Sequence, residues 1–438
     1  MNQLPRWLLC AGVTAFGVAC GRGSVLICAN GGHGIVTPVG FCASVFAENI
    51  RFGRHITVTE DGRVFVIRQR PGDDPSRPTS VLALYDSNRD EAISDHERRE
   101  FGSVYGSDIK WRTPHLYVSS PIRVVRYKLN DRDLVPSGEP ETVIQDFPQS
   151  YGMEHTSRPF TFDPEGQIYL HVGTPSNSCQ EENRVLGSPG ISPCPSLENW
   201  GGVWRFPANA LGLRFPTDGA KVVSGMRHTL GMIWNRQAGV VNFVQQGRDE
   251  LHDLFPDAYT QDEGAALPSE ELLEATPGAN FGWPYCYFDP AQNRRVLAPE
   301  YGGDGKEAAD CGGYSRPLAV FPAHTSPSDM LWYTGTMFPE RFTKGVFVSF
   351  AGGWGRRPFD QLGYNIAFVP YADGRPTGTW EVFADGFARK APIRLPTDAE
   401  GRPSGLGQMP DGSLLVLDSR KGVVWRIRYS RRLAPSTE

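Results

Sequence analysis

The chain has 438 residues, a formal net charge of −5 and 21% charged residues. Charges of both signs are interspersed, so no phosphate-neutralising surface is indicated and nucleic acid is not expected as a partner. The 49 glycines and 36 prolines divide the chain into short segments, and no window of about 15 residues beyond the first twenty shows helical periodicity. The composition therefore predicts an all-β protein.

The first twenty residues predict export. They hold one arginine and then an uncharged run from Trp7 to Ala19, which is too short to span a bilayer but suits the apolar part of a secretory signal. Cys20 follows in a setting that resembles a lipoprotein processing site, and ordinary signal cleavage nearby is the alternative. We expect a periplasmic or cell-surface protein whose only contact with a membrane would be a lipid anchor at Cys20.

One local pattern recurs four times along the chain. An arginine or histidine precedes an apolar run, a turn containing glycine and a second apolar run, at residues 54–67, 155–172, 227–244 and 402–417. Alternating apolar residues on both sides of a position that tolerates positive φ are typical of a β-hairpin. Each copy is therefore predicted to be two short strands joined at a tight turn.

The spacing of the four copies predicts a six-bladed β-propeller. They lie about 70 residues apart or at multiples of that distance, which suits roughly six four-stranded blades around a central channel. Residues 1–20 are then the signal peptide, 21–45 an N-terminal extension and 46–432 the propeller. A polar residue just before each innermost strand would recur at one mouth of the channel, which places the following side chains around one axial pocket: Arg54, His55, His155, Arg158, Arg227, His228 and Arg402. The alternative for any single copy is a solvated residue at a strand end.

The cysteines agree with export. Beyond Cys10 and Cys20, six cysteines fall into three neighbouring couples, Cys28 with Cys42, Cys179 with Cys194 and Cys286 with Cys311. The sequence alone leaves all the connectivities of six cysteines open, although the Gly- and Pro-rich loops between the couples suit local disulfides in an oxidising compartment. The absence of CxxCH and CxxC spacing gives no reason to expect covalent haem or zinc.

Two of the repeats carry side chains suited to catalysis. His155 precedes a strand that begins near Pro159, and an imidazole can accept the proton of a hydroxyl that is being oxidised. Arg227 could pair with an anionic ligand or with Asp249. At Gly247 the next strand ends and exposes backbone carbonyls, which calcium accepts as ligands.

Two further stretches predict binding. Asp86, Asn88 and Asp90 with Glu97 occupy positions 1, 3, 5 and 12 of a loop that resembles an EF-hand, although Glu91 replaces its glycine. This loop is either a structural calcium site or a solvated charged loop. Near Trp354, two glycines could let the backbone approach a flat ligand while Arg356 reaches its acid groups, or they could form a surface turn.

The chain after about Pro38 resembles the sorbosone dehydrogenase group of soluble, pyrroloquinoline-quinone-dependent sugar dehydrogenases. The segments that carry the resemblance are GFCASVFAENI, CQEENRVLGSPG, QGRDELHD, PSEELLE, NFGWPYCYFDP, LAPEYGGDG, FPAH, YTGTMFP and GYNIAF. The resemblance implies a six-bladed propeller, exported to the periplasm, that holds the quinone and calcium at the channel mouth and oxidises the anomeric or aldehyde carbon of sugars.

The resemblance also implies residue roles. His155 matches the catalytic base, and Arg227 matches the arginine that stabilises negative charge on the quinone oxygen. Gly247 and Arg248 match the residues that offer backbone carbonyls to the active-site calcium. The cofactor contacts it implies are His228, which stands in the place of an asparagine, together with Gly247, Arg248, Arg356 and Arg402. Asp86, Asn88 and Asp90 match an acidic calcium loop of close relatives.

This chain departs from the family pattern around the cofactor. His228 replaces asparagine, Asp418-Ser419 replaces paired aspartates, and residues 351–356 read Ala-Gly-Gly-Trp-Gly-Arg where relatives read His-Gly-Ser-Trp-Asn-Arg. Each lost hydrogen-bonding group is expected to cost on the order of 1–3 kcal/mol.

Two functions follow from these observations. The first is a quinoprotein that oxidises a sugar or related aldehyde or alcohol and passes electrons to a separate acceptor such as a cytochrome or a quinone. The second is a noncatalytic propeller that binds carbohydrate or a protein. A lactonase is more remote, because such sites need several carboxylates or amides around calcium, whereas the repeats supply mainly arginine and histidine.

Overall fold

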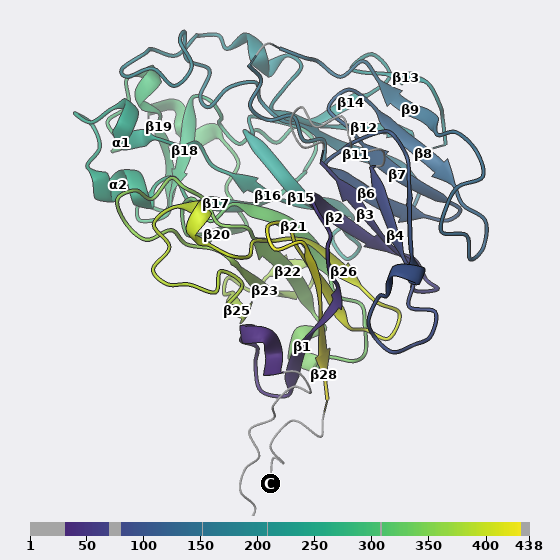
Figure 1. Cartoon of the computed structure of the whole chain (residues 1–438). Helices are drawn as coiled ribbons and strands as arrows, with labels where there is room; N and C mark the ends of the chain where they lie inside the picture. Colours follow the sequence, from purple (N-terminus) through teal and green to yellow (C-terminus); the bar gives the residue numbers. More distant parts are fainter. Residues whose placement is uncertain (1–30, 70–79, 151, 208, 307–308, 431–438) are drawn as a thin grey trace, which may run out of the picture.

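The computed structural model describes residues 31–69, 80–150, 152–207, 209–306 and 309–430 (Figure 1). These residues form six antiparallel blades of four strands each, which confirms the predicted propeller. The predicted signal peptide, including Cys20, lies outside the described residues. Within the described ranges no helix has the length and apolarity that a bilayer-spanning segment needs.

The first three blades follow one another along the chain. The first holds β2 (Gly53–Val58), β3 (Val64–Arg68), β4 (Val81–Leu84) and β5 (Arg98–Phe101). The second holds β6 (Asp108–Arg112), β7 (His115–Ser119), β8 (Val124–Lys128) and β9 (Glu141–Gln145), with the short β13 (Leu213–Arg214) added in parallel to β9. The third holds β10 (Phe160–Phe162), β11 (Gln167–Val172), β12 (Gly202–Pro207) and β14 (Ala220–Ser224).

The last three blades complete the ring. The fourth holds β15 (His228–Asn235), β16 (Val240–Gln246), β17 (Glu270–Glu274) and β20 (Ala319–Phe321). The fifth holds β21 (Pro327–Trp332), β22 (Gly345–Phe350), β23 (Asn365–Ala372) and β25 (Glu381–Ala384), with β24 (Arg375–Pro376) paired to β23. The sixth holds β26 (Pro403–Gln408), β27 (Leu414–Asp418), β28 (Val423–Tyr429) and, from the other end of the chain, β1 (Phe41–Ala47).

Strand β1 closes the ring and corrects one predicted boundary. It pairs antiparallel with β28 from Phe41↔Tyr429 onward, and both strands lie at the bottom of Figure 1. The predicted start of the propeller at residue 46 is therefore too late, because most of this strand lies within the predicted extension 21–45. The first and last parts of the chain share one blade, which ties the ring together.

The four predicted hairpins are confirmed, and each is the inner pair of a blade. They are β2 with β3, β10 with β11, β15 with β16, and β26 with β27. The turn glycines Gly62, Gly166 and Gly412 have φ of 90°, 93° and 89°, which is the conformation that the pattern requires. The inner strands contact one another around the hub, β2 with β6 and β26, β15 with β10 and β21, and β21 with β26.

The hydrophobic core lies between neighbouring blades. One cluster joins Phe160 and Trp204 of the third blade to Val124 and Ile144 of the second. Another joins Phe347 of the fifth blade to the last blade. Blade faces are apolar on both sides, as sheets stacked face to face require.

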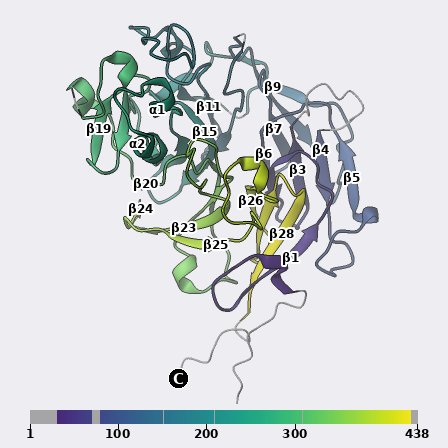
Figure 2. The same cartoon turned by 60° about the vertical axis from the view of Figure 1, so that its left-hand side comes forward.

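An insertion between β17 and β20 of the fourth blade, together with the loop before it, builds one side of the upper face. It contains the hairpin of β18 (Cys286–Asp289) and β19 (Arg294–Leu297), and the short helices α1 (Leu251–Leu254) and α2 (Gln261–Ala266) precede β17. Figure 2 shows these elements together at one edge of the ring. Disulfides join Cys179 to Cys194 and Cys286 to Cys311, so that two of the neighbouring couples pair locally. Cys42 is also disulfide-bonded, and Cys28 lies outside the described residues.

Candidate functional site

A cavity of about 540 Å³ opens where the inner strands begin. We call it the hub cavity, and its lining residues are Glu154, His155, Arg184, Arg227, Gln246, Gly247, Asp249, Glu270, His324, Ser326, Gly352, Gly353, Trp354, Gly355 and Arg402. Among the predicted site residues it brings together His155, Arg227, Gly247 and Arg402. Arg248, Arg356 and His228 do not line it.

His155 is held as a neutral base. Its Nδ1 lies 2.8 Å from the carbonyl oxygen of Thr174, and because a carbonyl only accepts, Nδ1 carries the proton and Nε2 has the free lone pair. Burial and, after it, the charge of Arg227 lower the pKa of His155 to about 3. The imidazole is therefore unprotonated at neutral pH, with Nε2 available to accept a proton.

His228 supports the base from behind. Its ring stacks on that of His155 with centroids 4.6 Å apart and planes at 27°. The stack needs Gly173, because a Cβ there would lie 2.7 Å from the Cβ of His155 and 3.1 Å from Nδ1 of His228. His228 thus contacts the base instead of lining the hub cavity, and a cofactor contact at His228 stays a prediction.

Arg227 is the most buried arginine of the cavity. It is 4% exposed, donates from Nη1 to the carbonyl of Gly247 at 2.7 Å and pairs through Nη2 with Asp249 at 2.8 Å. Burial alone would raise the pKa of Asp249, but Arg227, His324 and Arg184 hold it well below its ordinary value. The alternative predicted for Arg227, pairing with Asp249, is what the structure shows.

Arg184 and Glu154 extend this network to the outer wall. Arg184 pairs with Glu154 at 2.7 Å, with Asp249 at 3.1 Å and with Glu250 at 2.6 Å. Its guanidinium also lies over the ring of Trp354 at 5.7 Å. The repeats predicted a basic channel mouth. The structure instead shows a network in which arginines pair with carboxylates.

Two more titratable groups complete the cavity. Glu270 accepts hydrogen bonds from the backbone N–H groups of Gly247 (2.8 Å) and Ser326 (3.1 Å). Burial raises the pKa of Glu270 to about 7. Burial would lower the pKa of His324, but Asp249 and Glu270 raise it above its ordinary value. With Glu270 partly protonated and His324 partly charged, the cavity has an excess of positive charge at neutral pH.

Arg402 closes the cavity on the side of the last blade. Its Nε donates to the carbonyl of Ala351 at 2.7 Å, and its Nη2 bonds the carbonyl of Gly352. Asp418 accepts from the backbone N–H of Arg402 and so shapes the turn that presents this side chain. Arg402 is the only one of the three cavity arginines without an ion pair among the described residues.

The glycines near Trp354 serve protein packing. A Cβ on Gly352 would meet the ring of Tyr364 at 2.2 Å, and a Cβ on Gly353 would meet the carbonyl oxygen of His324 at 2.3 Å. Arg356 does not line the cavity and donates to the carbonyls of Ala265 and Asp360. The structure thus does not place Arg356 where it could meet the acid groups of a ligand in the hub cavity.

Other predicted residues lie apart from the cavity. Arg158 is fully buried and donates to the carbonyls of His155 and Ser157. Deeper in the hub, His55 bonds Asp108 at 3.1 Å. The side chain of Arg248 pairs with Glu300.

The predicted calcium loop is held by hydrogen bonds to its own side chains. Asp86 accepts from the backbone N–H groups of Asp90 and Glu91, and Glu91 takes the positive φ of 71° that glycine usually supplies. Both oxygens of Glu97 accept hydrogen bonds from Ser87 and Ser94. Calcium at Asp86, Asn88, Asp90 and Glu97 stays a prediction, and among the described residues no cluster of three or more His, Cys, Asp or Glu is arranged to hold a metal.

The hub cavity fits an anionic, planar cofactor better than it fits calcium. Arg184, Arg227 and Arg402 face one space, the buried Nε of Arg227 has no hydrogen-bond partner, and Trp354 supplies a ring face. These features suit the several carboxylates and flat rings of pyrroloquinoline quinone. A cation on the carbonyl of Gly247 would instead sit beside the guanidinium that already bonds this oxygen, which like charges oppose.

The buried histidines predict steep loss of stability in acid. Burial lowers the pKa of His155 and His171 to about 3 and that of His228 well below 6.5. The contribution of these neutral histidines to the free energy of unfolding is therefore complete above pH 6.5 and is lost as the pH falls below 6.5. Glu270 has the opposite effect: because its pKa is raised to about 7, its contribution to the free energy of unfolding increases as the pH falls from about 7 to 4.5. Together, these three histidines and Glu270 should take up a net of about two protons on unfolding between pH 5 and 6, which lowers the free energy of unfolding by roughly 2–3 kcal/mol per pH unit.

Urea unfolding at several pH values measures this slope. His171→Asn should reduce it by about one proton, or about 1.4 kcal/mol per pH unit, because His171 is fully buried and bonds the carbonyl of Gly202 through Nδ1. An unchanged slope in this variant would show that the buried imidazoles are not the source of the pH dependence.

The charged residues of the hub cavity that were not predicted all lie within or beside motifs that were. Arg184 belongs to CQEENRVLGSPG, Glu270 to PSEELLE and His324 to FPAH, while Glu154 directly precedes His155. Their polar character within these motifs was the signal that could have identified them. That they face one cavity depends on how the blades close into a ring, which the local sequence does not show.

Comparison with known proteins relates this chain to one family. The TrAA12-like family matches residues 35–430, whereas no curated protein sequence matches the chain. A Trichoderma reesei carbohydrate-active enzyme of family AA12 is 17% identical, with a TM-score of 0.71 over 91% of this chain and 98% of that one. The holo pyranose dehydrogenase PQQ domain of Coprinopsis cinerea is 17% identical, with a TM-score of 0.69 over 90% of this chain and 97% of that one.

A more distant neighbour has the same ring. The PQQ-bound aldose sugar dehydrogenase of Streptomyces coelicolor is 15% identical, with a TM-score of 0.54 over 90% of this chain and 100% of that one. At these identities the structural likeness establishes the fold, and membership of the sorbosone dehydrogenase group stays a prediction. The family match, which extends over nearly the whole propeller, shows that the chain belongs to the TrAA12-like family.

Proposed function

We propose that this protein is a pyrroloquinoline-quinone-dependent oxidoreductase that oxidises a sugar or a related aldehyde or alcohol. The observation that carries the proposal is the hub cavity, in which a neutral imidazole with a free Nε2 faces the same space as three arginines. Family membership supports it, since the neighbours with this fold include pyranose and aldose sugar dehydrogenases that bind PQQ.

Each residue has a defined task in this proposal. Arg402 and Arg227, with Arg184 at the outer wall, would bind the carboxylates and oxygens of the cofactor, which would supply the two-electron acceptor that takes up the hydride. Nε2 of His155 accepts the proton of a sugar hydroxyl while a hydride leaves the carbon that bears this hydroxyl. One O–H bond and one C–H bond are thereby converted into a C=O bond. The carbonyl of Thr174 keeps the proton on Nδ1 throughout.

The proposal includes export and a separate electron carrier. Residues 1–20 and the two disulfides among the described residues support an oxidising compartment. No calcium step is included, because the carbonyl of Gly247 is bonded to Arg227.

Cofactor titration tests the proposal. Purified protein is mixed with the quinone, with calcium or with EDTA, and reduction of an artificial electron acceptor is followed after addition of aldoses. Arg402→Gln should weaken quinone binding by roughly 10- to 100-fold, the loss of a charge-assisted hydrogen bond, whereas Arg236→Gln, an exposed arginine outside the cavity, should not. Saturable quinone binding that Arg402→Gln leaves intact, or no reduction with any sugar, would contradict the proposal.

A noncatalytic propeller remains the second candidate. It is favoured by the ion pairs that already neutralise Arg184 and Arg227, because a ligand must compete with Glu154 and Asp249 for them. Thermal stabilisation by sugars without quinone uptake would support it.

A further inference from the structure

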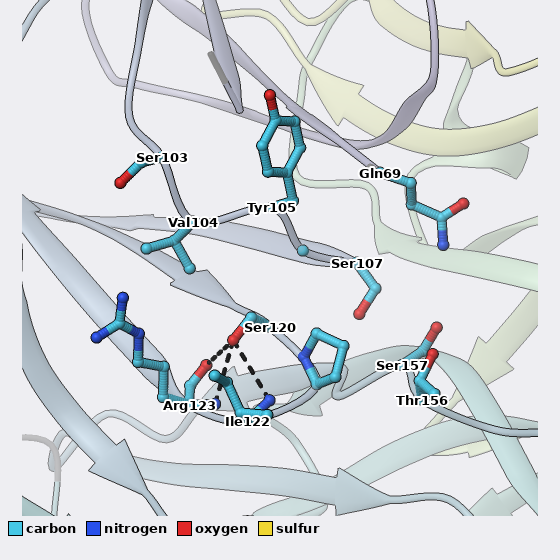
Figure 3. Close-up of a pocket in the computed structure, with 12 residues that line it drawn as sticks. Gln69, Ser103, Val104, Tyr105, Ser107, Ser120, Ile122, Arg123, Thr156 and Ser157 are labelled. Atoms are coloured by element: carbon cyan, nitrogen blue, oxygen red, sulfur yellow. Dashed lines mark hydrogen bonds between the residues drawn. The ribbon is translucent and has the colours of Figure 1, made fainter. Parts of the chain in front are cut away.

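A second pocket of about 510 Å³ lies on the same face, between the upper loops of the first, second and third blades. We call it the rim pocket, and Figure 3 shows its lining: Gln69, Ser103, Val104, Tyr105, Gly106, Ser107, Ser120, Pro121, Ile122, Arg123, Thr156 and Ser157. It shares no lining residue with the hub cavity. The two are nevertheless neighbours along the chain, because Thr156 and Ser157 directly follow His155.

The walls of the rim pocket are fixed by hydrogen bonds. Ser120 Oγ donates to the carbonyl of Arg123 at 2.9 Å and accepts from its N–H at 3.1 Å, which sets the turn that carries Pro121 and Ile122 (Figure 3). Gly106 lets the opposite loop lie against this turn, since a Cβ there would be 1.8 Å from the carbonyl oxygen of Ser119. The pocket is thus built into the blades.

Several polar groups of the lining are available to a ligand. Ser107 Oγ accepts from the N–H of Arg158 and keeps its own proton for donation. The hydroxyls of Thr156 and Ser157 have no hydrogen bond in the described part of the chain, and in Figure 3 both lie at one side of the pocket. These groups suit a ligand that carries many hydroxyls.

The charge of the lining is one-sided. Arg123 is its only charged residue, is half-buried and makes no ion pair within the described ranges. No carboxylate lines the pocket to neutralise it. Such a guanidinium, with free hydroxyl donors in the same pocket, suits a carboxylate. Val104, Pro121 and Ile122 offer apolar surface for the C–H groups of a sugar ring or chain.

We propose that the rim pocket binds a sugar acid, with Arg123 holding the carboxylate and the hydroxyls of Thr156 and Ser157 bonding those of the ligand. The proposal does not depend on the redox function, because it requires neither cofactor nor turnover.

Calorimetric titration of the cofactor-free protein tests this proposal with gluconate, glucose and propionate as probes. Gluconate should bind saturably with a Kd of about 1 mM or below, and glucose and propionate, which each lack one half of the recognised chemistry, at least about tenfold more weakly. Glucose or propionate binding as tightly as gluconate would overturn the proposal, as would the absence of saturable gluconate binding.

Variants locate the bound acid. Arg123→Gln should weaken gluconate binding by about 10- to 100-fold and Thr156→Val by several-fold, while Arg236→Gln and Arg402→Gln should leave it unchanged. If Arg402→Gln abolished binding and Arg123→Gln did not, the acid would be in the hub cavity and the proposal would be wrong.

Discussion

Replacing His155 by asparagine is expected to lower kcat for sugar oxidation by about 10²- to 10⁴-fold at saturating quinone, the usual contribution of a general base. Asparagine can still donate to the carbonyl of Thr174, as Nδ1 of His155 does at 2.8 Å, but it has no lone pair basic enough to accept a hydroxyl proton. Steady-state rates with the reconstituted protein measure the loss. Quinone affinity should change little, because the contacts proposed for the cofactor are made by arginines and not by His155.

His171→Asn is the matched control. His171 is buried like His155 and bonds a carbonyl through Nδ1, that of Gly202 at 2.9 Å, yet it does not line the hub cavity. Its substitution should lower stability and leave kcat within about twofold, as expected for a residue outside the reacting groups. Equal losses of kcat in the two variants would mean that His155 acts through the fold and not as a base.

Arg227→Met has the second large expected effect, on both stability and cofactor binding. The substitution leaves Asp249 without the guanidinium that pairs with it at 2.8 Å and leaves the carbonyl of Gly247 without its donor. Breaking such a pair from one side costs roughly 3–5 kcal/mol when it is buried, and we expect the lower end because Arg184 still contacts Asp249 at 3.1 Å. Urea unfolding and quinone titration of the variant measure the two losses.

The double variant Arg227→Met with Asp249→Asn separates the two effects. Removing the unpaired carboxylate should restore part of the free energy of unfolding, whereas quinone affinity should stay low because the cation is still missing. If Asp249→Asn restored quinone binding as well, the role of Arg227 would be to neutralise Asp249 and not to bind the cofactor.

The sequence predicted the ring because the information about it is local. Alternating apolar runs with a turn glycine specify a hairpin within about 15 residues, and four of the six inner hairpins carry that pattern. The other two were missed since their inner strands bear Asp108 and Asp329 in place of arginine or histidine. Asp108 accepts a hydrogen bond from the backbone N–H of Phe160, and Asp329 accepts one from that of Leu406, each in the next inner strand. These bonds connect neighbouring blades, and no local sequence pattern predicts them.

The candidate site was predicted only in part for the same reason. His155, Arg227 and Arg402 belong to the repeated pattern and line the hub cavity, whereas Arg54 and Arg158 of the same pattern do not. Arg356 has no such position, and its guanidinium is taken by carbonyls of its own loop and of α2. The boundary at residue 46 failed because the pairing of β1 with β28 joins residues from opposite ends of the chain, which no local pattern reveals.

The central claim is that His155 and the arginines of the hub cavity form one binding site for an acidic redox cofactor. A crystal structure of the protein grown with pyrroloquinoline quinone tests it most directly. We expect the quinone in the hub cavity, with its carboxylates on Arg402 or Arg227 and its reactive carbonyl facing Nε2 of His155. Quinone bound elsewhere, or an intact hub cavity that excludes it at saturating concentration, would contradict the account.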